Sequence, residues 1–180
     1  MRTLLLVALV ALIATGRPAG AQPAAGFTDT LVVSGLSTPT GVAFLPDGRM
    51  VITEKGGALK LYDGVSTTTL AIIPVCSTIE MGLLDVAVDP DFDSNGFLYL
   101  YRTESAGGCG SATGRSNEVV RVTMSGGTVS LGSLVVLLTG IQTDGGNHDG
   151  GGLRLAADGT LYIGVGDTGI GDQVDRKSVV

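Results

Sequence analysis

The sequence has 180 residues, enough for one ordinary domain or for a part of a larger one. With 17 acidic and 11 basic residues its formal net charge is −6 at pH 7, and the chain contains no run of Lys or Arg. This acidic balance argues against nucleic acid and against an anionic membrane surface as partners.

The N-terminus has the pattern of a secretory signal peptide. Arg2 gives a basic start, residues 3–15 form an apolar run, and the small residues 19–21 make an A-x-A cleavage site before Gln22. The apolar run is shorter than the roughly 20 residues that a membrane-spanning helix needs. We therefore expect residues 1–21 to be removed and the mature protein to be secreted or periplasmic in a bacterium.

Downstream of the signal, the pattern is typical of an all-β fold. Short runs of Val, Ile, Leu, Thr and Tyr alternate with Gly, Asp and Ser, and helical periodicity is nearly absent. Asp47-Gly48 and Asp158-Gly159 each suit a tight hairpin turn. Tyr99, Tyr101 and Tyr162 are expected to pack between sheets. Ten strands are predicted, over residues 40–44, 50–54, 59–62, 69–74, 84–88, 97–102, 118–123, 134–139, 152–155 and 161–165.

One pattern recurs along the chain. Residues 41–54, 84–103 and 151–167 each contain an apolar alternation, a turn with Asp, and a second alternating strand, and equivalent positions are separated by 44 and 67 residues. The first interval is typical of propeller blades, at about 40–50 residues each, and the second indicates an insertion, assigned to Ser105–Gly114. Because a single blade cannot bury both of its faces, the sequence predicts a partial β-propeller of about three blades.

These assignments set the expected domain boundaries. Residues 22–174 are predicted to form the N-terminal half of a β-propeller, with Val174 or a neighbour as the last native residue. The hexapeptide DRKSVV, residues 175–180, corresponds to a common sequencing adapter translated in one frame before a stop codon. We interpret residues 175–180 as a non-native tail.

Cys76 and Cys109 are the only two cysteines, and a disulfide between them is the first interpretation. An even number of cysteines in a chain expected to be exported favours pairing. Two free thiols are an alternative. A zinc site that uses both cysteines and the single histidine, His148, is disfavoured because no ligand pair has C-x-x-C spacing. The sequence therefore predicts a disulfide and no metal site.

The motif GVGDTG, residues 164–169, follows a predicted strand and fits the pattern G-x-G-x-x-G of dinucleotide-binding loops. That fingerprint requires a helix that opens at the third glycine and an acidic residue about 20 positions later. Here Asp167 would repel a pyrophosphate, and the following Ile-Gly-Asp-Gln has no helical character. The motif therefore does not indicate a nucleotide site.

The motif DFDSNG, residues 91–96, fits the first half of a calcium-binding loop. Position 12 of such a loop would be Arg102, where a bidentate Glu is required, and the flanking segments are predicted strands rather than helices. A solvated turn between two strands accounts for the same residues, with calcium at this position as the alternative.

His148 is the residue that points most directly to chemistry. A lone histidine is more commonly a surface or structural residue, so a catalytic interpretation needs a second feature. Asp167 follows 19 residues later across the predicted hairpin, and antiparallel pairing brings both residues to the same end of the sheet. A carboxylate there can accept the ring N–H, fix the tautomer and raise the basicity of the other nitrogen. The pair is predicted to be a general base with its orienting acid.

Four motifs occur in succession: TPTGVAFLPDGRMVITEKGGALKLYDG (38–64), EMGLLDVAVDPDFDSNGFLYLYRT (80–103), NEVVRVT (117–123) and NHDGGGLRLAADGTLYIGVGD (147–167). In this order they resemble the glucose/sorbosone dehydrogenase family, the soluble quinoprotein aldose sugar dehydrogenases. The resemblance extends from about Leu36 to Asp172. It implies a six-bladed β-propeller, with pyrroloquinoline quinone (PQQ) and calcium as cofactors.

The resemblance also implies roles for individual residues. The base of the family falls on His148, its partner aspartate on Asp167, and a residue that contacts the sugar on Glu80. The implied reaction is oxidation of an aldose at its anomeric carbon to the lactone, with an electron acceptor as second partner. In this family the residues that hold the quinone and calcium belong to the second half of the protein. None is therefore predicted here, and the 180-residue chain is expected to be inactive by itself.

Two other function classes stay open. One is a non-catalytic propeller that binds sugar or protein, which the presence of both His148 and Asp167 disfavours. The other is a propeller hydrolase of the lactonase type, which would use metal ligands at the blade entrances. No Glu/Asn/Asp constellation in the sequence supports that second class.

Overall fold

The computed structural model describes residues 23–110, 114–168 and 177–179. The predicted signal peptide, residues 1–21, therefore lies outside the described residues. The chain divides into residues 1–34 and residues 35–180, which are described separately. Within the first part, the described residues contain one turn. No helix in the described ranges is long and apolar enough to cross a membrane.

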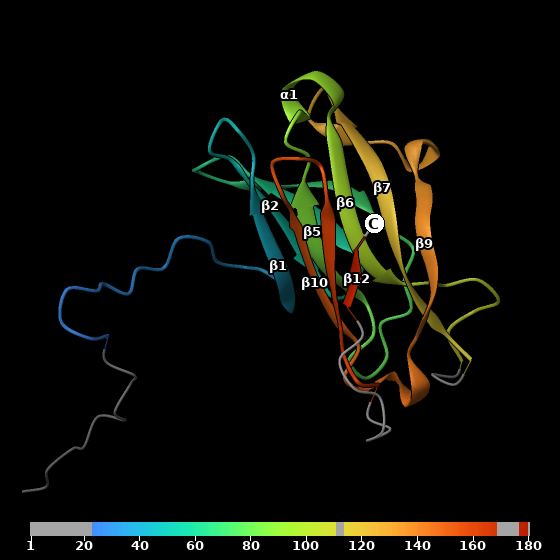
Figure 1. The fold of residues 1–180 in the computed structure, drawn as a ribbon. Helices are drawn as coiled ribbons and strands as arrows, with labels where there is room; N and C mark the ends of the chain where they lie inside the picture. Colours follow the sequence, from blue (N-terminus) through green and yellow to red (C-terminus); the bar gives the residue numbers. More distant parts are fainter. Residues whose placement is uncertain (1–22, 111–113, 169–176, 180) are drawn as a thin grey trace, which may run out of the picture. The chain divides into compact units, whose positions relative to one another are not determined.

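Residues 35–180 form three antiparallel β-sheets that follow one another along the chain (Figure 1). The first contains β1 (Pro39–Phe44), β2 (Met50–Glu54), β3 (Ala58–Tyr62) and β4 (Thr67–Ile72). The second contains β5 (Leu83–Val88), β6 (Phe97–Thr103), β7 (Ser116–Ser125) and β8 (Thr128–Val129), with β9 (Val135–Gln142) also paired to β7. The third contains β10 (Gly150–Leu155), β11 (Leu161–Val165) and β12 (Lys177–Val179). The helical turns are α1 (Phe92–Asn95), η1 (Leu131–Ser133) and η2 (Asp144–Gly146).

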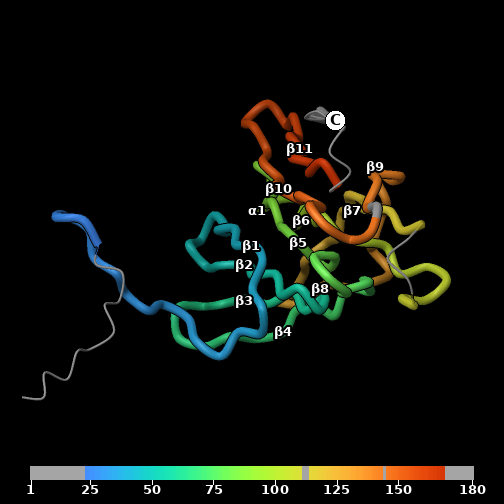
Figure 2. The backbone as a smooth tube through the Cα atoms, turned by 90° about the horizontal axis from the view of Figure 1, so that it is seen from below, coloured from blue at the N-terminus to red at the C-terminus, as the bar shows by residue number. Residues whose placement is uncertain are grey.

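The three sheets meet along their first strands. β1 and β10 both pack against β5, and the later strands of each sheet lie farther out (Figure 2). Strands that are neighbours in a sheet are also neighbours in sequence, apart from β9. The contact between β5 and β10 brings the segment that precedes β5 close to the segment that precedes β10. These two segments carry Glu80 and His148.

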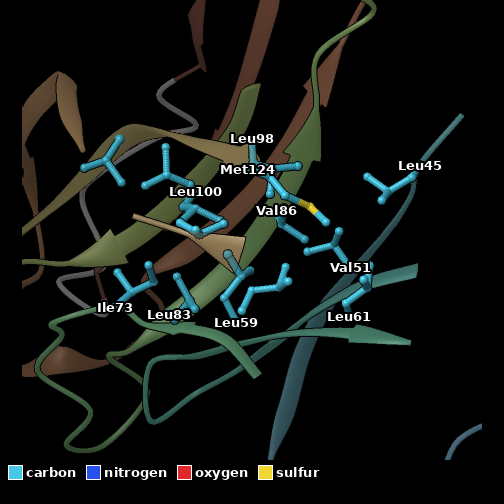
Figure 3. Close-up of a cluster of buried hydrophobic side chains, with 14 residues drawn as sticks. Leu45, Val51, Leu59, Leu61, Ile73, Leu83, Val86, Leu98, Leu100 and Met124 are labelled. Atoms are coloured by element: carbon cyan, nitrogen blue, oxygen red, sulfur yellow. The ribbon is translucent and has the colours of Figure 1, made fainter. Parts of the chain in front are cut away.

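Period-two alternation divides the side chains of the middle sheet between two cores. Leu98, Leu100 and Val120 belong to the core shared with the first sheet, whereas Tyr101 and Val119 belong to the core shared with the third. In the first core, labelled side chains from both sheets point toward one another (Figure 3). Its members are Leu45, Val51, Leu59, Leu61, Leu70, Ile73, Leu83, Val86, Leu98, Leu100, Val120, Val122, Met124 and Val129. The second core contains Ala87, Tyr101, Val119, Leu153, Leu161 and Ile163.

All ten predicted strands are present, and their ends differ from the prediction by no more than three residues. The middle sheet carries an additional segment in two parts. One is the predicted connection between β6 and β7, around Ser105–Gly114, and the other is β8 with η1, between β7 and β9. The sequence did not indicate this second part, because a two-residue strand carries too little pattern to be recognised.

The position of Tyr162 and the structure of residues 92–95 differ from the prediction. Tyr99 and Tyr101 pack against the second core as expected, but Tyr162 is 52% exposed. Leu161 and Ile163 take the inward positions of β11, so alternation turns Tyr162 to the opposite face. Residues 92–95 form the helical turn α1 where a simple turn was expected.

The C-terminal segment is described only over β12, which pairs antiparallel with β11. β12 lies within residues 175–180, the predicted non-native tail. Residues 175, 176 and 180 lie outside the described residues. The assignment of 175–180 as non-native stays a prediction.

A disulfide joins Cys76, between β4 and β5, to Cys109, in the connection between β6 and β7. The bond closes a loop over a sequence separation of 33 residues. It ties the segment that leads to Glu80 to the long connection of the middle sheet. Both alternatives for the cysteines, free thiols and a zinc site, are wrong.

Removal of the disulfide is expected to destabilise the protein. In the chain-entropy model a loop of this length contributes roughly 3–4 kcal/mol to the free energy of unfolding. Guanidinium unfolding of the Cys76→Ser/Cys109→Ser double variant should therefore show a loss of about that size. Treatment with a reductant should lower the stability of the parent and leave the double variant unchanged. Equal stability of parent and double variant would contradict the expectation.

Candidate functional site

The β10–β11 hairpin brings His148 and Asp167 to one end of the third sheet. Gly150 pairs with Val165 in the hairpin register, so both residues lie just beyond the last paired position. His148 Nδ1 lies 2.7 Å from Asp167 Oδ1. Their side chains are 59% and 46% exposed. The structure thus places in direct contact the two residues that the sequence analysis singles out.

The backbone at His148 is held in an uncommon conformation. Its φ is +52°, in the left-handed region that only a few per cent of non-glycine residues adopt. The His148 carbonyl oxygen accepts a hydrogen bond from the Thr168 N–H at 3.3 Å. A Cβ atom added at Gly166 would overlap that oxygen, so glycine at position 166 allows the two chain segments to approach closely. These contacts at its carbonyl oxygen hold the backbone from which the imidazole extends.

Glu80 contacts the same residue from the segment before β5. Its Oε2 accepts a hydrogen bond from the His148 backbone N–H at 2.6 Å, and its own backbone N–H donates to the Gly146 carbonyl oxygen at 3.0 Å. The carboxylate that the family resemblance assigns to the sugar thus supports the backbone of His148. Glu80 and His148 are 68 residues apart in sequence, and the packing of β10 on β5 brings them together.

The electrostatics of the pair favour a protonated imidazole. The Asp167 carboxylate raises the pKa of His148 above its ordinary value of 6.5, first through the hydrogen bond and then through its charge. The charges of Glu80 and Asp149 act in the same direction. All three groups are carboxylates, so the ring lies in an anionic environment.

The hydrogen bond also selects the tautomer of the neutral ring. When Nδ1 carries the proton and donates it to Asp167, Nε2 keeps its lone pair and becomes the acceptor nitrogen. Nε2 makes no hydrogen bond to any residue in the described ranges. Because the side chain is more than half exposed, a ligand can reach this nitrogen. The arrangement can therefore accept a proton from a bound hydroxyl group.

The other two motifs form local structure. In DFDSNG, Asp89 lies just before the motif and closes the turn, because its Oδ1 accepts hydrogen bonds from the Asp91 N–H and the Asn95 side chain. Its Oδ2 accepts one from the Tyr99 hydroxyl at 2.7 Å. In GVGDTG, Gly166 packs directly against the carbonyl oxygen of His148. Among the residues whose side chains the structure describes, no group of three or more His, Cys, Asp or Glu is arranged to hold a metal ion.

Sequence reasoning missed Asp149, the immediate neighbour of His148. The residue is only 2% exposed, and its side chain accepts a hydrogen bond from Asn117 on β7. An aspartate among glycines in a predicted loop is typical of a solvated turn, so the local sequence gave no sign of this burial. Only the contact between the second and third sheets reveals it.

The chain is similar to proteins of a known family. Residues 36–179 match the family model described as glucose/sorbosone dehydrogenase. The chain belongs to this family. The resemblance that the four successive sequence motifs indicate is therefore confirmed.

Individual members of the family include proteins with assigned activities. The chain is 31% identical over 141 residues to the aldose sugar dehydrogenase YliI of Escherichia coli and 25% identical over 150 residues to quinoprotein glucose dehydrogenase B of Acinetobacter calcoaceticus. It matches the PQQ-bound aldose sugar dehydrogenase of Streptomyces coelicolor with a TM-score of 0.63 and 29% identity. These matches cover 73%, 79% and 77% of this chain, respectively. They extend over 36%, 31% and 40% of the relatives, so the chain spans less than half of the length of each.

Proposed function

We propose that this chain is the N-terminal half of a six-bladed β-propeller which, in the whole protein, oxidises an aldose at its anomeric carbon to the lactone. The observation that carries the proposal is the 2.7 Å hydrogen bond between His148 and Asp167, with Nε2 of the ring open to a ligand. Membership in the glucose/sorbosone dehydrogenase family supports the substrate class. The names of the relatives from Escherichia coli and Acinetobacter calcoaceticus support sugar dehydrogenation.

The arrangement of the sheets supports the propeller. Each of the three sheets contributes its first strand to a common line of contact, and its strands continue outward in sequence order. Blades around a central channel have this arrangement. On this basis each sheet is one blade, with β1, β5 and β10 innermost.

His148 acts as the general base in the proposed reaction. Its Nε2 takes the proton of the anomeric hydroxyl, while Asp167 holds Nδ1–H and stabilises the imidazolium that forms. PQQ, when bound, supplies the two-electron acceptor for the hydride that leaves the anomeric carbon. The raised pKa of His148 makes the ring a stronger base than a free imidazole.

Glu80 has two proposed roles. Its Oε2 supports the His148 backbone, and its side chain is exposed, so the remaining carboxylate oxygen can accept a hydrogen bond from a sugar hydroxyl. In this way one carboxylate would fix the substrate relative to the base that acts on it. Correct relative orientation of substrate and base lowers the barrier to reaction.

The cofactors are proposed from the family relationship, and the chemistry of the residues fits them in part. An imidazole with an acceptor nitrogen and an orienting carboxylate fits the proton-accepting part of a quinone-dependent oxidation. The charged groups that act on His148 are carboxylates, which do not bind the carboxylates of PQQ. We therefore propose that the residues that hold PQQ and calcium lie elsewhere in the whole protein, and that the 180-residue chain alone is inactive. The signal pattern supports a secreted or periplasmic location.

The proposal is tested with the whole protein, loaded with PQQ and calcium, an aldose and an electron-accepting dye. Dye reduction that depends on both PQQ and the aldose, with the lactone as product, is expected. The same preparation without PQQ is the control. Hydrolysis of a lactone without quinone, or sugar binding without any oxidation, would contradict the proposed reaction.

Replacement of Asp167 by Asn is expected to change the pH profile as well as the rate. Catalysis requires neutral His148, and Asp167 raises the pKa of His148, so kcat/KM of the parent should fall with decreasing pH in a limb centred above 6.5. Asp167→Asn should move this limb to lower pH and reduce kcat at least about tenfold, because the orienting charge is lost.

The measurement is kcat/KM as a function of pH for the variant and for a matched control. Asp158→Asn removes an exposed carboxylate from the turn of the same hairpin, where it accepts a hydrogen bond from the Thr160 N–H. This control should leave the acidic limb where it is. An unchanged limb in Asp167→Asn would show that Asp167 does not set the protonation of the base.

A further inference from the structure

Asp149 combines burial with a position next to the most exposed part of the site. Asp149 is buried, with 2% of the residue exposed, whereas the side chain of the adjacent His148 is 59% exposed. Asp149 Oδ1 accepts a hydrogen bond from Asn117 Nδ2 at 3.0 Å. The Asp149 carbonyl oxygen accepts another from the Tyr101 hydroxyl at 3.0 Å. Side chain and backbone of Asp149 are thus both held by the middle sheet.

The hydrogen bonds continue from Asp149 to the segment that carries Glu80. Asn117 Oδ1 accepts from the Thr103 hydroxyl at 2.7 Å, and Thr103 Oγ1 accepts from the Gly82 N–H at 3.1 Å. Asn117 and Thr103 are fully buried. Gly82 is two residues from Glu80, whose carboxylate accepts the His148 N–H. The contacts therefore form a closed ring that leads from His148 through Asp149 and the middle sheet back to His148.

The closed ring of hydrogen bonds holds the backbone of His148 in a conformation that is not its energy minimum. A non-glycine residue at positive φ, such as His148, costs of the order of 1 kcal/mol or more and persists where surrounding contacts determine it. Asp149 provides such contacts on the C-terminal side of His148, and Glu80 provides one at its N–H. Asp149 Oδ2 is buried and has no hydrogen-bond partner among the described residues.

We propose that Asp149 is a positioning residue for the base: through Asn117 and Tyr101 it anchors the backbone at His148 so that the imidazole meets Asp167. This inference rests on the proposed function for its effect on catalysis, but its effect on the imidazole does not depend on any reaction. Asp149 does not touch the substrate. Its carboxylate acts through the 148–149 backbone, and misplacement of a reacting group by about 1 Å can cost about 100-fold in rate.

The test compares Asp149→Ala with Asp149→Asn in the whole protein. Asp149→Ala removes the acceptor for Asn117 and should reduce kcat about 10–100-fold with little change in KM. Asp149→Asn keeps an oxygen that can accept the same hydrogen bond and should stay within about threefold of the parent. Tyr101→Phe removes only the hydroxyl on the Asp149 carbonyl and keeps the packing of the ring. It should reduce kcat about threefold to tenfold, and it decides the question if Asp149→Ala does not fold.

A second readout follows the imidazole itself by NMR titration without PQQ, with the His148 signal assigned by its loss in His148→Gln. Tyr101→Phe should lower the pKa of His148 toward 6.5, because the imidazole no longer meets Asp167. Asp149→Ala should lower this pKa further than Asp149→Asn, which removes the same charge but keeps the acceptor for Asn117. This result stands even if the whole protein oxidises no sugar, so failure of the proposed function and failure of this inference are distinguishable.

Asp89→Ala is the matched control, since Asp89 is a partly buried carboxylate that accepts hydrogen bonds from the Asn95 side chain and the Tyr99 hydroxyl, at the opposite end of β5 from Glu80. It should reduce stability and leave the His148 titration and kcat unchanged. Asp149→Ala and Tyr101→Phe with parental kcat and a parental His148 titration would overturn the proposal. So would equal losses of kcat in Asp149→Ala and Asp149→Asn.

Discussion

His148→Gln is expected to reduce kcat for aldose oxidation by about 10²–10⁴-fold in the PQQ-loaded whole protein, the usual contribution of a positioned general base. Gln keeps polar atoms of similar reach but has no basic nitrogen, so the proton of the anomeric hydroxyl has no acceptor. The His148 side chain is 59% exposed, so its replacement removes little packing. The melting temperature should therefore change little while the rate collapses.

The measurement for His148→Gln is steady-state dye reduction, with the fraction of bound PQQ determined separately. An exogenous imidazole buffer should restore part of the lost rate, because it supplies a base that can enter the vacated space. If the variant retains a rate within a few-fold of the parent at equal PQQ content, the proton goes elsewhere and the base assignment is wrong.

Gly166→Ala is expected to disable the site by a steric route. A Cβ at residue 166 would overlap the carbonyl oxygen of His148, which is a backbone atom and cannot move away as the end of a side chain can. The loop must shift, and the imidazole must shift with it. A displacement of about 1 Å should cost roughly 100-fold in kcat, and His148 should lose its hydrogen bond to Asp167.

The matched control for Gly166→Ala is Gly152→Ala on β10. A Cβ at Gly152 meets no atom within 4 Å. Gly152→Ala introduces the same extra methyl group, two residues after the first residue of β10. This substitution should leave kcat and the titration of His148 unchanged. Equal effects of the two substitutions would show that the site responds to any loss of glycine in this hairpin and not to the contact with His148.

The strands could be predicted because their apolar residues either alternate with polar ones or form a continuous run. β2 and β11 begin and end where the apolar alternation does, at Met50–Glu54 and Leu161–Val165. β8 could not be predicted, because two residues show no period. The outward position of Tyr162 also depends on which face of β11 meets the middle sheet, and the sequence of one strand does not determine that.

The pair of His148 and Asp167 could be predicted because both flank one hairpin, so the register alone brings them together. Glu80 was assigned by resemblance, but its contact with the His148 N–H depends on the packing of β10 against β5. Asp149 was missed for a related reason. Its partner Asn117 lies 32 residues away on another sheet, and no local pattern of a Gly-rich loop distinguishes a buried aspartate from a solvated one.

The central claim, that His148 takes the proton of an anomeric hydroxyl, is tested most directly by comparing an aldose with its methyl glycoside in the PQQ-loaded whole protein. The methyl glycoside keeps the ring, the other hydroxyls and the anomeric hydrogen, but it has no proton on the anomeric oxygen. The account predicts turnover of the aldose and none of the methyl glycoside, while the glycoside still binds as a competitive inhibitor. Oxidation of the methyl glycoside at a rate comparable to that of the aldose would contradict it.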